Sequence, residues 1–194
     1  MTPAVVTRPA IVLVLLVSLS AGCAGQRSSD PGQRFISGDG VIEQIPADQR
    51  DDVAPITGKL LDGRSFDSRD LAGKVVVYNV WGSWCAPCRK EAPALRKVSE
   101  ETRGKGVRFV GIDVKDNDGP AIAFERSFDI TYPSIRTADS PKALLAFGTT
   151  LPPSAVPSTL VIDRQGRIAA RVIGASSYAT LTALIDDVLE ESDE

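Results

Sequence analysis

Histidine is absent from the sequence, and basic residues are not in excess. Without imidazole, catalytic bases of the Ser-His-Asp or Cys-His type and histidine metal ligands are excluded. Lysine and arginine together number 22 and aspartate and glutamate 25, which gives a net charge of −3. A nucleic-acid-binding protein needs a basic surface that neutralises phosphates, so the charge argues against that class of partner.

The composition is that of a folded domain. Hydrophobic residues make up 43% and charged residues 24% of the 194 residues. These fractions are close to the average of globular proteins, and the chain is too apolar to be disordered. The length allows about one domain once the N-terminal residues are set aside as a targeting signal.

The N-terminal residues are expected to direct export. Arg8 precedes an apolar run from Ala10 to Leu19, about half the roughly 20 residues that a membrane-spanning helix needs. The following Ser20-Ala21-Gly22-Cys23 resembles the lipobox of bacterial lipoproteins, although Leu19 lies one place further from the cysteine than the preferred leucine. Residues 1–22 are therefore predicted to be a lipoprotein-type signal peptide and Cys23 to be lipidated. The alternative is an ordinary cleaved signal that leaves Cys23 as a stray thiol.

Residues 23–52 are predicted to be a flexible tether. Gly, Ser, Asp, Gln and Arg dominate this segment, and no apolar period is sustained. The folded domain is then expected to span residues 53–194, with its first ordered residue near Val53.

Hydrophobic patterns and turn residues predict alternating strands and helices in that domain. Asp62-Gly63 indicates a turn between two short strands, and an apolar run rich in valine indicates a buried strand at 74–80. Strands are expected at 56–61, 65–66, 74–80, 107–114, 159–163 and 168–173, and helices at 86–103, 120–128, 142–147 and 177–190. This order predicts an α/β domain in which a mixed sheet carries helices on both faces.

The sequence Cys85-Ala86-Pro87-Cys88 lies where the central strand gives way to a helix. At a helix N-terminus, unpaired N–H groups and the helix dipole favour the thiolate of Cys85 and make it the nucleophile. Cys88, three residues further, lies on the same helix face and can resolve a mixed disulfide between Cys85 and a substrate. Three other interpretations compete: a zinc site completed by carboxylates, a structural disulfide that closes only a small loop, and a pair of buried free thiols with no role.

The segment from Val80 to Pro93 resembles the active-site segment of the thioredoxin superfamily. The match is specifically to the membrane-tethered extracytoplasmic branch, the TlpA-like or ResA-like proteins, and it extends from about Val53 to the C-terminus. It includes the opening hairpin, an insert between Asp113 and Tyr132, and the segment from Val156 to Asp163. The resemblance implies a thioredoxin-like fold, with a central mixed β-sheet flanked by helices, an N-terminal β-hairpin and a central insert.

The resemblance also assigns roles around the cysteines. It implies that Pro157 is a cis-proline facing the disulfide, which presents the backbone of Val156 to an extended substrate segment; the alternative is a trans proline that starts an edge strand. Ser158 replaces the threonine more usual after this proline, which leaves the substrate contacts open. Trp84 would shield the thiol and shape the docking surface, whereas the alternative for Trp81 and Trp84 is plain packing.

Three carboxylates are also considered. Glu91 matches a glutamate near the active site of ResA-like proteins, where a carboxylate opposes thiolate formation by its charge and offers a proton acceptor. The alternative is a solvated glutamate among basic neighbours. Asp113 and Asp163, at strand ends, are expected to form turns and not to catalyse.

The resemblance implies a thiol-disulfide oxidoreductase that is held by lipid on the extracytoplasmic side of the bacterial cell membrane. Its redox group would be the Cys85–Cys88 disulfide, with no other cofactor and no metal. ResA-like proteins reduce disulfides, for example in apocytochromes c before haem attachment, with electrons from a membrane thiol carrier. The expected partners are thiols and disulfides of exported proteins, and a monomer is the working expectation.

Three other functions stay open. The same residues would serve an oxidase that forms disulfides in secreted proteins, because the direction depends on the reduction potential. A thiol peroxidase is disfavoured, since the sequence has no Pro-X-X-X-Thr-X-X-Cys loop. A non-catalytic binding lipoprotein is disfavoured by the intact pair of cysteines.

Overall fold

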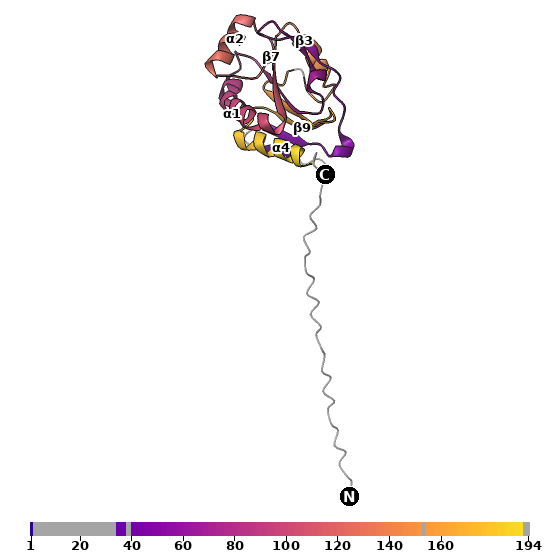
Figure 1. The fold of residues 1–194 in the computed structure, drawn as a ribbon. Helices are drawn as coiled ribbons and strands as arrows, with labels where there is room; N and C mark the ends of the chain where they lie inside the picture. Colours follow the sequence, from indigo (N-terminus) through magenta and orange to yellow (C-terminus); the bar gives the residue numbers. More distant parts are fainter. Residues whose placement is uncertain (2–33, 38–39, 153, 192–194) are drawn as a thin grey trace.

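A seven-stranded mixed sheet forms the centre of the structure, a computed structural model that describes residues 1, 34–37, 40–152 and 154–191 (Figure 1). The strand order is β1-β2-β9-β8-β5-β6-β7. At its centre, β5 (Val75–Trp81) is parallel to β6 (Val107–Asp113) and antiparallel to β8 (Ser158–Ile162). The other strands of this sheet are β1 (Arg34–Ser37), β2 (Gly40–Gln44), β7 (Ser134–Ile135) and β9 (Ile168–Ile173).

Helices cover both faces of the sheet, which explains why every residue of β5 is buried. On one face, α1 (Ala86–Thr102) and α4 (Tyr178–Glu190) lie side by side (Figure 1) and pack on Val75 and Val77. On the other face, Val76 and Tyr78 pack against α3 (Ser140–Leu145) and against the hairpin of β3 (Thr57–Lys59) and β4 (Ser65–Asp67). The remaining helical segments are α2 (Asp118–Ser127) and the 3-10 turns η1 (Ala47–Gln49), η2 (Ser68–Leu71) and η3 (Arg103–Lys105).

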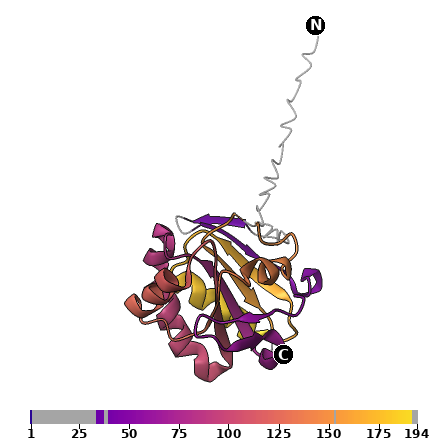
Figure 2. The ribbon, with the colours of Figure 1, turned by 90° about the horizontal axis from the view of Figure 1, so that it is seen from above.

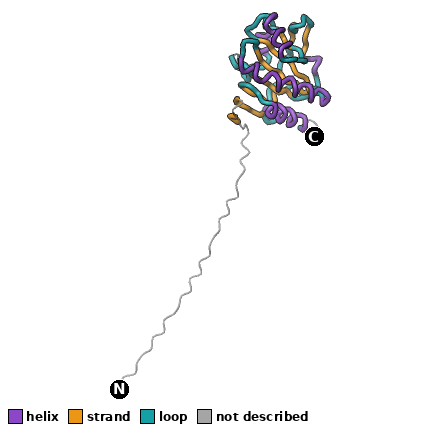
Figure 3. The backbone as a smooth tube through the Cα atoms, turned by 90° about the vertical axis from the view of Figure 1, so that its left-hand side faces the viewer, coloured by secondary structure: helices purple, strands orange, loops and turns teal. Residues whose placement is uncertain are grey.

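The predicted α/β class with a mixed sheet between helices is confirmed (Figures 2 and 3). The opening hairpin is β3–β4, and the insert between Asp113 and Tyr132 contains α2. The prediction that Asp163 forms a turn is also confirmed, because its Oδ1 accepts hydrogen bonds from the N–H groups of Gln165 and Arg167. Sequence patterns missed β7, whose two residues are too few to show a period.

The predicted start of the folded domain at Val53 is wrong. β2 pairs with β9, and the N–H of Ile45 donates to the carbonyl of Ala169 over 2.8 Å. These residues are ordered by a strand far away in the sequence, so no local hydrophobic pattern reveals them. The predicted signal peptide after Met1, together with Cys23, lies outside the described residues. Within the described part, no helix is both long enough and apolar enough to cross a membrane.

Arg50 fastens this N-terminal segment to the domain. Its side chain is 4% exposed, and its guanidinium pairs with Asp163 at 3.2 Å and with Glu191 at 2.6 Å. We expect Arg50→Ala to lower the free energy of unfolding by about 2 kcal/mol. This is less than the roughly 3–5 kcal/mol typical of a broken buried pair, because Arg167 still pairs with Asp163.

Urea unfolding of the two proteins measures this loss. Arg64→Ala is the matched control, since the ion pair of Arg64 with Asp62 is exposed and such pairs contribute about 1 kcal/mol or less. Equal losses in both variants would show that Arg50 does not anchor the segment.

Candidate active site

The two cysteines form a disulfide at the start of α1. Cys85 is the N-cap residue of the helix, and its Sγ accepts a hydrogen bond from the N–H of Cys88 over 3.2 Å. Pro87 occupies the first turn, where a helix has N–H groups to spare. The predicted position of Cys85 at a helix N-terminus is therefore confirmed. Once the disulfide is reduced, the same N–H and the helix dipole favour a thiolate on Cys85.

Access to the disulfide is narrow. Cys85 is 3% exposed and Cys88 only 1%, and both pack with Trp81, Ala92 and Phe124. A substrate sulfur can therefore reach Cys85 only when a partner docks closely against the surrounding surface. Among the described residues, no group of three or more Cys, Asp or Glu side chains could hold a metal ion.

Glu91 is buried beneath the cysteines, one helical turn after Cys88. It is 2% exposed; its Oε1 accepts a hydrogen bond from Asn79 Nδ2 over 2.9 Å, and its Oε2 accepts one from the N–H of Ser176 over 2.7 Å. Burial raises the pKa of Glu91 to about 7, although both hydrogen bonds oppose this rise. The alternative of a solvated glutamate is therefore wrong.

A small cavity lies between the Glu91 network and the resolving cysteine. Its volume is about 10 Å³, and Cys88 and Asn79 both line it. This is close to the minimum of about 10–15 Å³ that one water molecule needs. Asn79, which donates to Glu91, thus joins the buried carboxyl to the space beside the Cys88 sulfur.

The Val156–Pro157 peptide bond is cis, as the resemblance implied. Pro157 is buried, and Val156 is half-buried against the cluster that contains Cys85 and Cys88. No described residue forms a backbone hydrogen bond with Val156. With respect to the described part of the chain, its N–H and carbonyl are thus available to pair with an added extended segment.

The two tryptophans have different environments. Trp81 is 3% exposed and stacks on Phe124 with 4.4 Å between the ring centroids, so its role is packing. Trp84 is 54% exposed, and its indole Nε1 donates to the carbonyl of Val114 over 3.1 Å. Gly82 is required beneath this indole, because a Cβ there would lie 2.5 Å from Nε1. The packing interpretation thus fails for Trp84, whose indole forms part of the surface beside Cys85.

Asp113 is not a turn residue, contrary to the prediction. It is fully buried at the end of β6, and its Oδ2 accepts a hydrogen bond from Thr137 Oγ1 over 2.7 Å. Burial raises its pKa to about 7. Thr137 Oγ1 in turn accepts from the N–H of Asp116, whose Oδ2 accepts from the N–H of Ser83. Asp113 therefore belongs to a hydrogen-bond network that holds the loop before the cysteines. The sequence signal for this buried role was a carboxylate at the end of an otherwise apolar strand.

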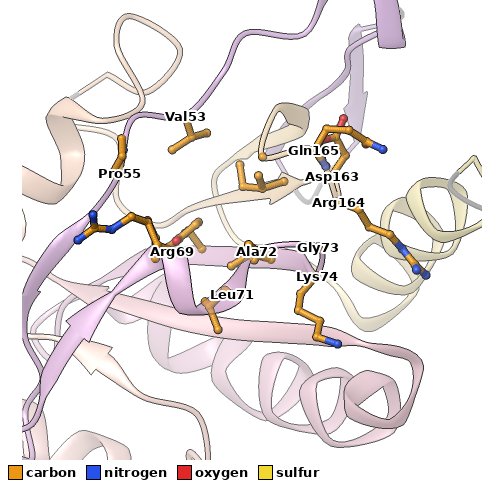
Figure 4. A pocket seen from close by; sticks show the side chains of 15 residues that line it. Val53, Pro55, Arg69, Leu71, Ala72, Gly73, Lys74, Asp163, Arg164 and Gln165 are labelled. Carbon is orange, nitrogen blue, oxygen red and sulfur yellow. Dashed lines mark hydrogen bonds between the residues drawn. The ribbon is translucent and has the colours of Figure 1, made fainter.

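A separate pocket of about 210 Å³ lies at the other end of the sheet (Figure 4). Lys74 before β5 and Asp163 after β8 line it, whereas the cysteines follow the opposite end of β5. No cysteine lines this pocket. Of the two ends of the sheet, the one where α1 begins therefore carries the described cysteines.

This arrangement is suited to thiol-disulfide exchange. Two successive displacements need three groups: a nucleophilic sulfur at a helix N-terminus, a resolving sulfur one turn later, and a buried acid–base group whose pKa is near neutral. The surface beside them offers the backbone of Val156, which no described residue pairs with, and an exposed indole at Trp84.

Comparisons with known proteins agree with this chemistry. A protein-family model described as Redoxin matches residues 44–185. The thiol-disulfide oxidoreductase ResA of Bacillus anthracis is 26% identical over 128 residues, which are 66% of this chain and 71% of that protein.

Two solved structures are also similar. A DsbF homologue from Corynebacterium diphtheriae is 35% identical with a TM-score of 0.70, and the match covers 80% of this chain and 98% of that one. A secreted thiol-disulfide isomerase from Corynebacterium glutamicum is 30% identical with a TM-score of 0.71, covering 84% and 99% of the two chains. The fold is therefore thioredoxin-like. The chain belongs to the Redoxin family and is a ResA-like thiol-disulfide oxidoreductase of the thioredoxin superfamily.

Proposed function

We propose that the protein reduces disulfides of exported proteins on the extracytoplasmic side of the bacterial cell membrane. Apocytochromes c before haem attachment are the substrate class that the ResA-like resemblance favours. The observation that carries the proposal is the placement of Glu91, a buried proton acceptor that titrates near pH 7, one turn below the resolving Cys88. A base at this position serves the step in which Cys88 must lose its proton to release a reduced substrate.

The reaction proceeds in two displacements. The Cys85 thiolate attacks one sulfur of the substrate disulfide, forms a mixed disulfide and releases the other substrate sulfur as a thiolate. The Cys88 thiol then gives its proton to the Glu91 carboxylate and attacks the Cys85 sulfur. This forms the Cys85–Cys88 disulfide and releases the second substrate sulfur, so two electrons pass to the substrate. A dithiol carrier in the membrane would reduce the enzyme again.

Substrate binding is assigned to the surface beside the disulfide. The unpaired backbone of Val156, held by the cis Pro157, would add an extended substrate segment as a short strand. Trp84 would cover the reacting sulfurs from solvent. Cys23 would carry the lipid that anchors the protein, after removal of residues 1–22, and the protein would act as a monomer.

An oxidase that forms disulfides is the second candidate. The hydrogen bond from the N–H of Cys88 to Cys85 Sγ favours the thiolate, and stabilising the reduced form makes a disulfide more oxidising. The ionised Glu91 acts in the opposite direction, because a negative charge near the sulfurs disfavours a thiolate. The two effects compete, and the reduction potential reports which one dominates.

The reduction potential of the Cys85–Cys88 couple tests the proposal. We expect a value near that of thioredoxin, about −270 mV, as a reductant requires. The chain without residues 1–23 is equilibrated in dithiothreitol or glutathione redox buffers, and the oxidised fraction is read from tryptophan fluorescence. A value near that of DsbA, about −120 mV, would contradict the proposal and assign the protein to disulfide formation.

A further inference from the structure

The pocket at the end of the sheet away from the cysteines (Figure 4) has an apolar floor. We call it the sheet-end pocket. Val76 and Tyr78 of β5 and Ile162 of β8 form the floor, and none of the three is more than 6% exposed. The volume of about 210 Å³ is smaller than the roughly 300–1,000 Å³ of pockets that hold drug-sized molecules. The pocket therefore has room for a small ligand that is partly apolar.

Two hydroxyl groups that line the pocket have a proton to donate. The hydroxyl of Tyr78 forms no hydrogen bond with any described residue, although Tyr78 is only 3% exposed, and burial raises the pKa of this phenol. Ser68 Oγ accepts a hydrogen bond from the N–H of Ile56 over 2.9 Å, but its own proton has no acceptor in the described part of the chain. Buried polar groups are ordinarily paired. The group that suits this pocket is therefore a hydrogen-bond acceptor.

Two positive charges lie at one edge of the pocket. Lys74 directly precedes β5, and Arg164 follows β8, the strand that pairs with β5. Figure 4 shows both side chains on the same side of the pocket. No carboxylate of the described ranges forms an ion pair with Lys74 or Arg164, and the Nε of Arg164 is buried without a partner. This edge of the pocket therefore favours an anion.

The carboxylate among the described lining residues does not cancel these charges. Asp163 Oδ2 pairs with Arg50 at 3.2 Å and with Arg167 at 2.9 Å, so two guanidinium groups already neutralise it. Arg69, which also lines the pocket, pairs with Asp67 and adds no free charge. The charge that remains at the pocket is therefore positive.

We propose that the sheet-end pocket binds a small organic anion, in which a carboxylate or a phosphate is attached to an apolar body. The apolar body packs on Val76 and Ile162, the anion pairs with Lys74 and Arg164, and the Tyr78 hydroxyl donates to an oxygen of the ligand. An inorganic anion would leave the apolar floor uncovered, and a neutral apolar molecule would leave the cations without a partner. The pocket lies at the opposite end of β5 from the disulfide. Binding there therefore does not depend on the proposed function.

Benzoate is the first probe, because it joins one apolar ring to one carboxylate. It is titrated into isotope-labelled protein, and nuclear magnetic resonance follows the backbone amides of Gly73 and Gly166, which line the pocket. We expect both signals to shift and to saturate with a dissociation constant of about 1 mM, as is reasonable for so small a ligand. Phenyl phosphate should saturate in the same way. Benzyl alcohol, which lacks the charge, and acetate, which lacks the ring, should bind at least about tenfold more weakly at the same ionic strength.

Two variants test the assigned contacts. Tyr78→Phe keeps the ring that packs edge-on against Phe147 and should weaken benzoate binding by about tenfold, because a buried hydrogen bond to a charged group is lost. Lys74→Gln should weaken it by about threefold, since an exposed ion pair contributes less. The matched control is Lys142→Gln, which removes an exposed lysine of α3 that does not line the pocket and should leave the affinity unchanged.

Several results would overturn the proposal. Shifts that do not saturate, equal affinity for benzoate and benzyl alcohol, or an affinity that neither variant lowers would each do so. Lys74 is exposed, so its variant remains informative if Tyr78→Phe disturbs the fold. Binding to phosphatidylglycerol vesicles that Lys74→Gln abolishes, without any response to benzoate, would assign these charges to a membrane surface instead. Failure of the proposed function is seen separately, as an unreactive disulfide in a protein that still binds benzoate.

Discussion

Cys88→Ser is expected to stop turnover and to leave Cys85 trapped in a mixed disulfide with its substrate. The first displacement needs only the Cys85 thiolate, which the start of α1 stabilises through the N–H of residue 88. The second displacement needs the sulfur of Cys88, and a serine hydroxyl cannot form the product disulfide. Steady-state turnover should therefore fall by at least about a thousandfold, as when a catalytic nucleophile is removed. Mass spectrometry after incubation with a disulfide substrate measures the adduct.

Cys85→Ser is the matched control for the order of the two cysteines. It should lose turnover to the same extent but accumulate no adduct, because Cys88 lies within the first turn of α1, whereas Cys85 is the N-cap sulfur that the helix N-terminus activates. An adduct on Cys88 in this variant would reverse the assigned roles. Normal function after both cysteines are replaced by serine would instead support a non-catalytic binding lipoprotein.

The elements that surround the disulfide were predictable because their signals are local. The apolar run of β5 reflects burial on both faces, and Cys85 follows it at the start of an amphipathic helix. Both signals depend on residues adjacent in the sequence. The central strand, α1 and the place of the cysteines between them could therefore be predicted without a structure.

The features that were missed depend on residues far apart in the sequence. β2 is ordered by pairing with β9, and Arg50 by ion pairs with Asp163 and Glu191, so the domain begins earlier than expected. Asp113 was predicted as a turn residue because no local pattern shows that Thr137 caps its carboxyl in the interior. Polar residues at strand ends can be assigned only when their three-dimensional neighbours are known.

The burial of Glu91 also depends on residues far away in the sequence, so it could be predicted only in part. Its resemblance to a ResA-like glutamate indicated a role, but a local pattern could not separate a buried carboxyl from a solvated one. The two donors that hold it come from β5 and from the loop before α4. Its raised pKa follows from that burial and has consequences for stability and for exchange.

Ionisation of Glu91 is expected to weaken the folded state as the pH rises. The pKa is about 7 in the fold, against an ordinary value of 4.5, so the folded protein holds this proton more tightly than the unfolded chain does. The stabilisation is complete below pH 4.5, declines between pH 4.5 and 7, and is absent above pH 7. The difference between the two pKa values corresponds to about 3 kcal/mol.

Glu91→Gln should abolish this part of the pH dependence. At low pH the variant should be less stable than the native protein, because the amide NH2 then faces one of the two donors, Asn79 Nδ2 or the N–H of Ser176. Relative to the native protein, the variant should gain about 3 kcal/mol between about pH 4 and 8. Urea unfolding across this range measures the difference. Asp113 contributes its own pH dependence in both proteins, which cancels in the comparison.

Glu100→Gln is the matched control, since Glu100 lies on the same helix but is exposed and pairs with Arg96 on the helix surface. This variant should follow the native protein at every pH. A Glu91→Gln variant that also followed the native pH dependence would show that Glu91 does not titrate in the fold.

Stability alone does not separate a structural carboxyl from one that serves the reaction, so the exchange rate must be followed as well. If Glu91 accepts the Cys88 proton, the resolution of a Cys85 mixed disulfide should accelerate in the native protein as the pH rises through about 7. In Glu91→Gln that rise should disappear, and resolution should depend on spontaneous ionisation of the Cys88 thiol. Glutamine also removes a negative charge, so alkylation of the reduced cysteines should begin at lower pH. The alkylation shift follows from the charge alone, so the resolution step decides the role. A structural carboxyl would leave the pH profile of resolution in place, whereas a proton acceptor must change both that profile and the unfolding data.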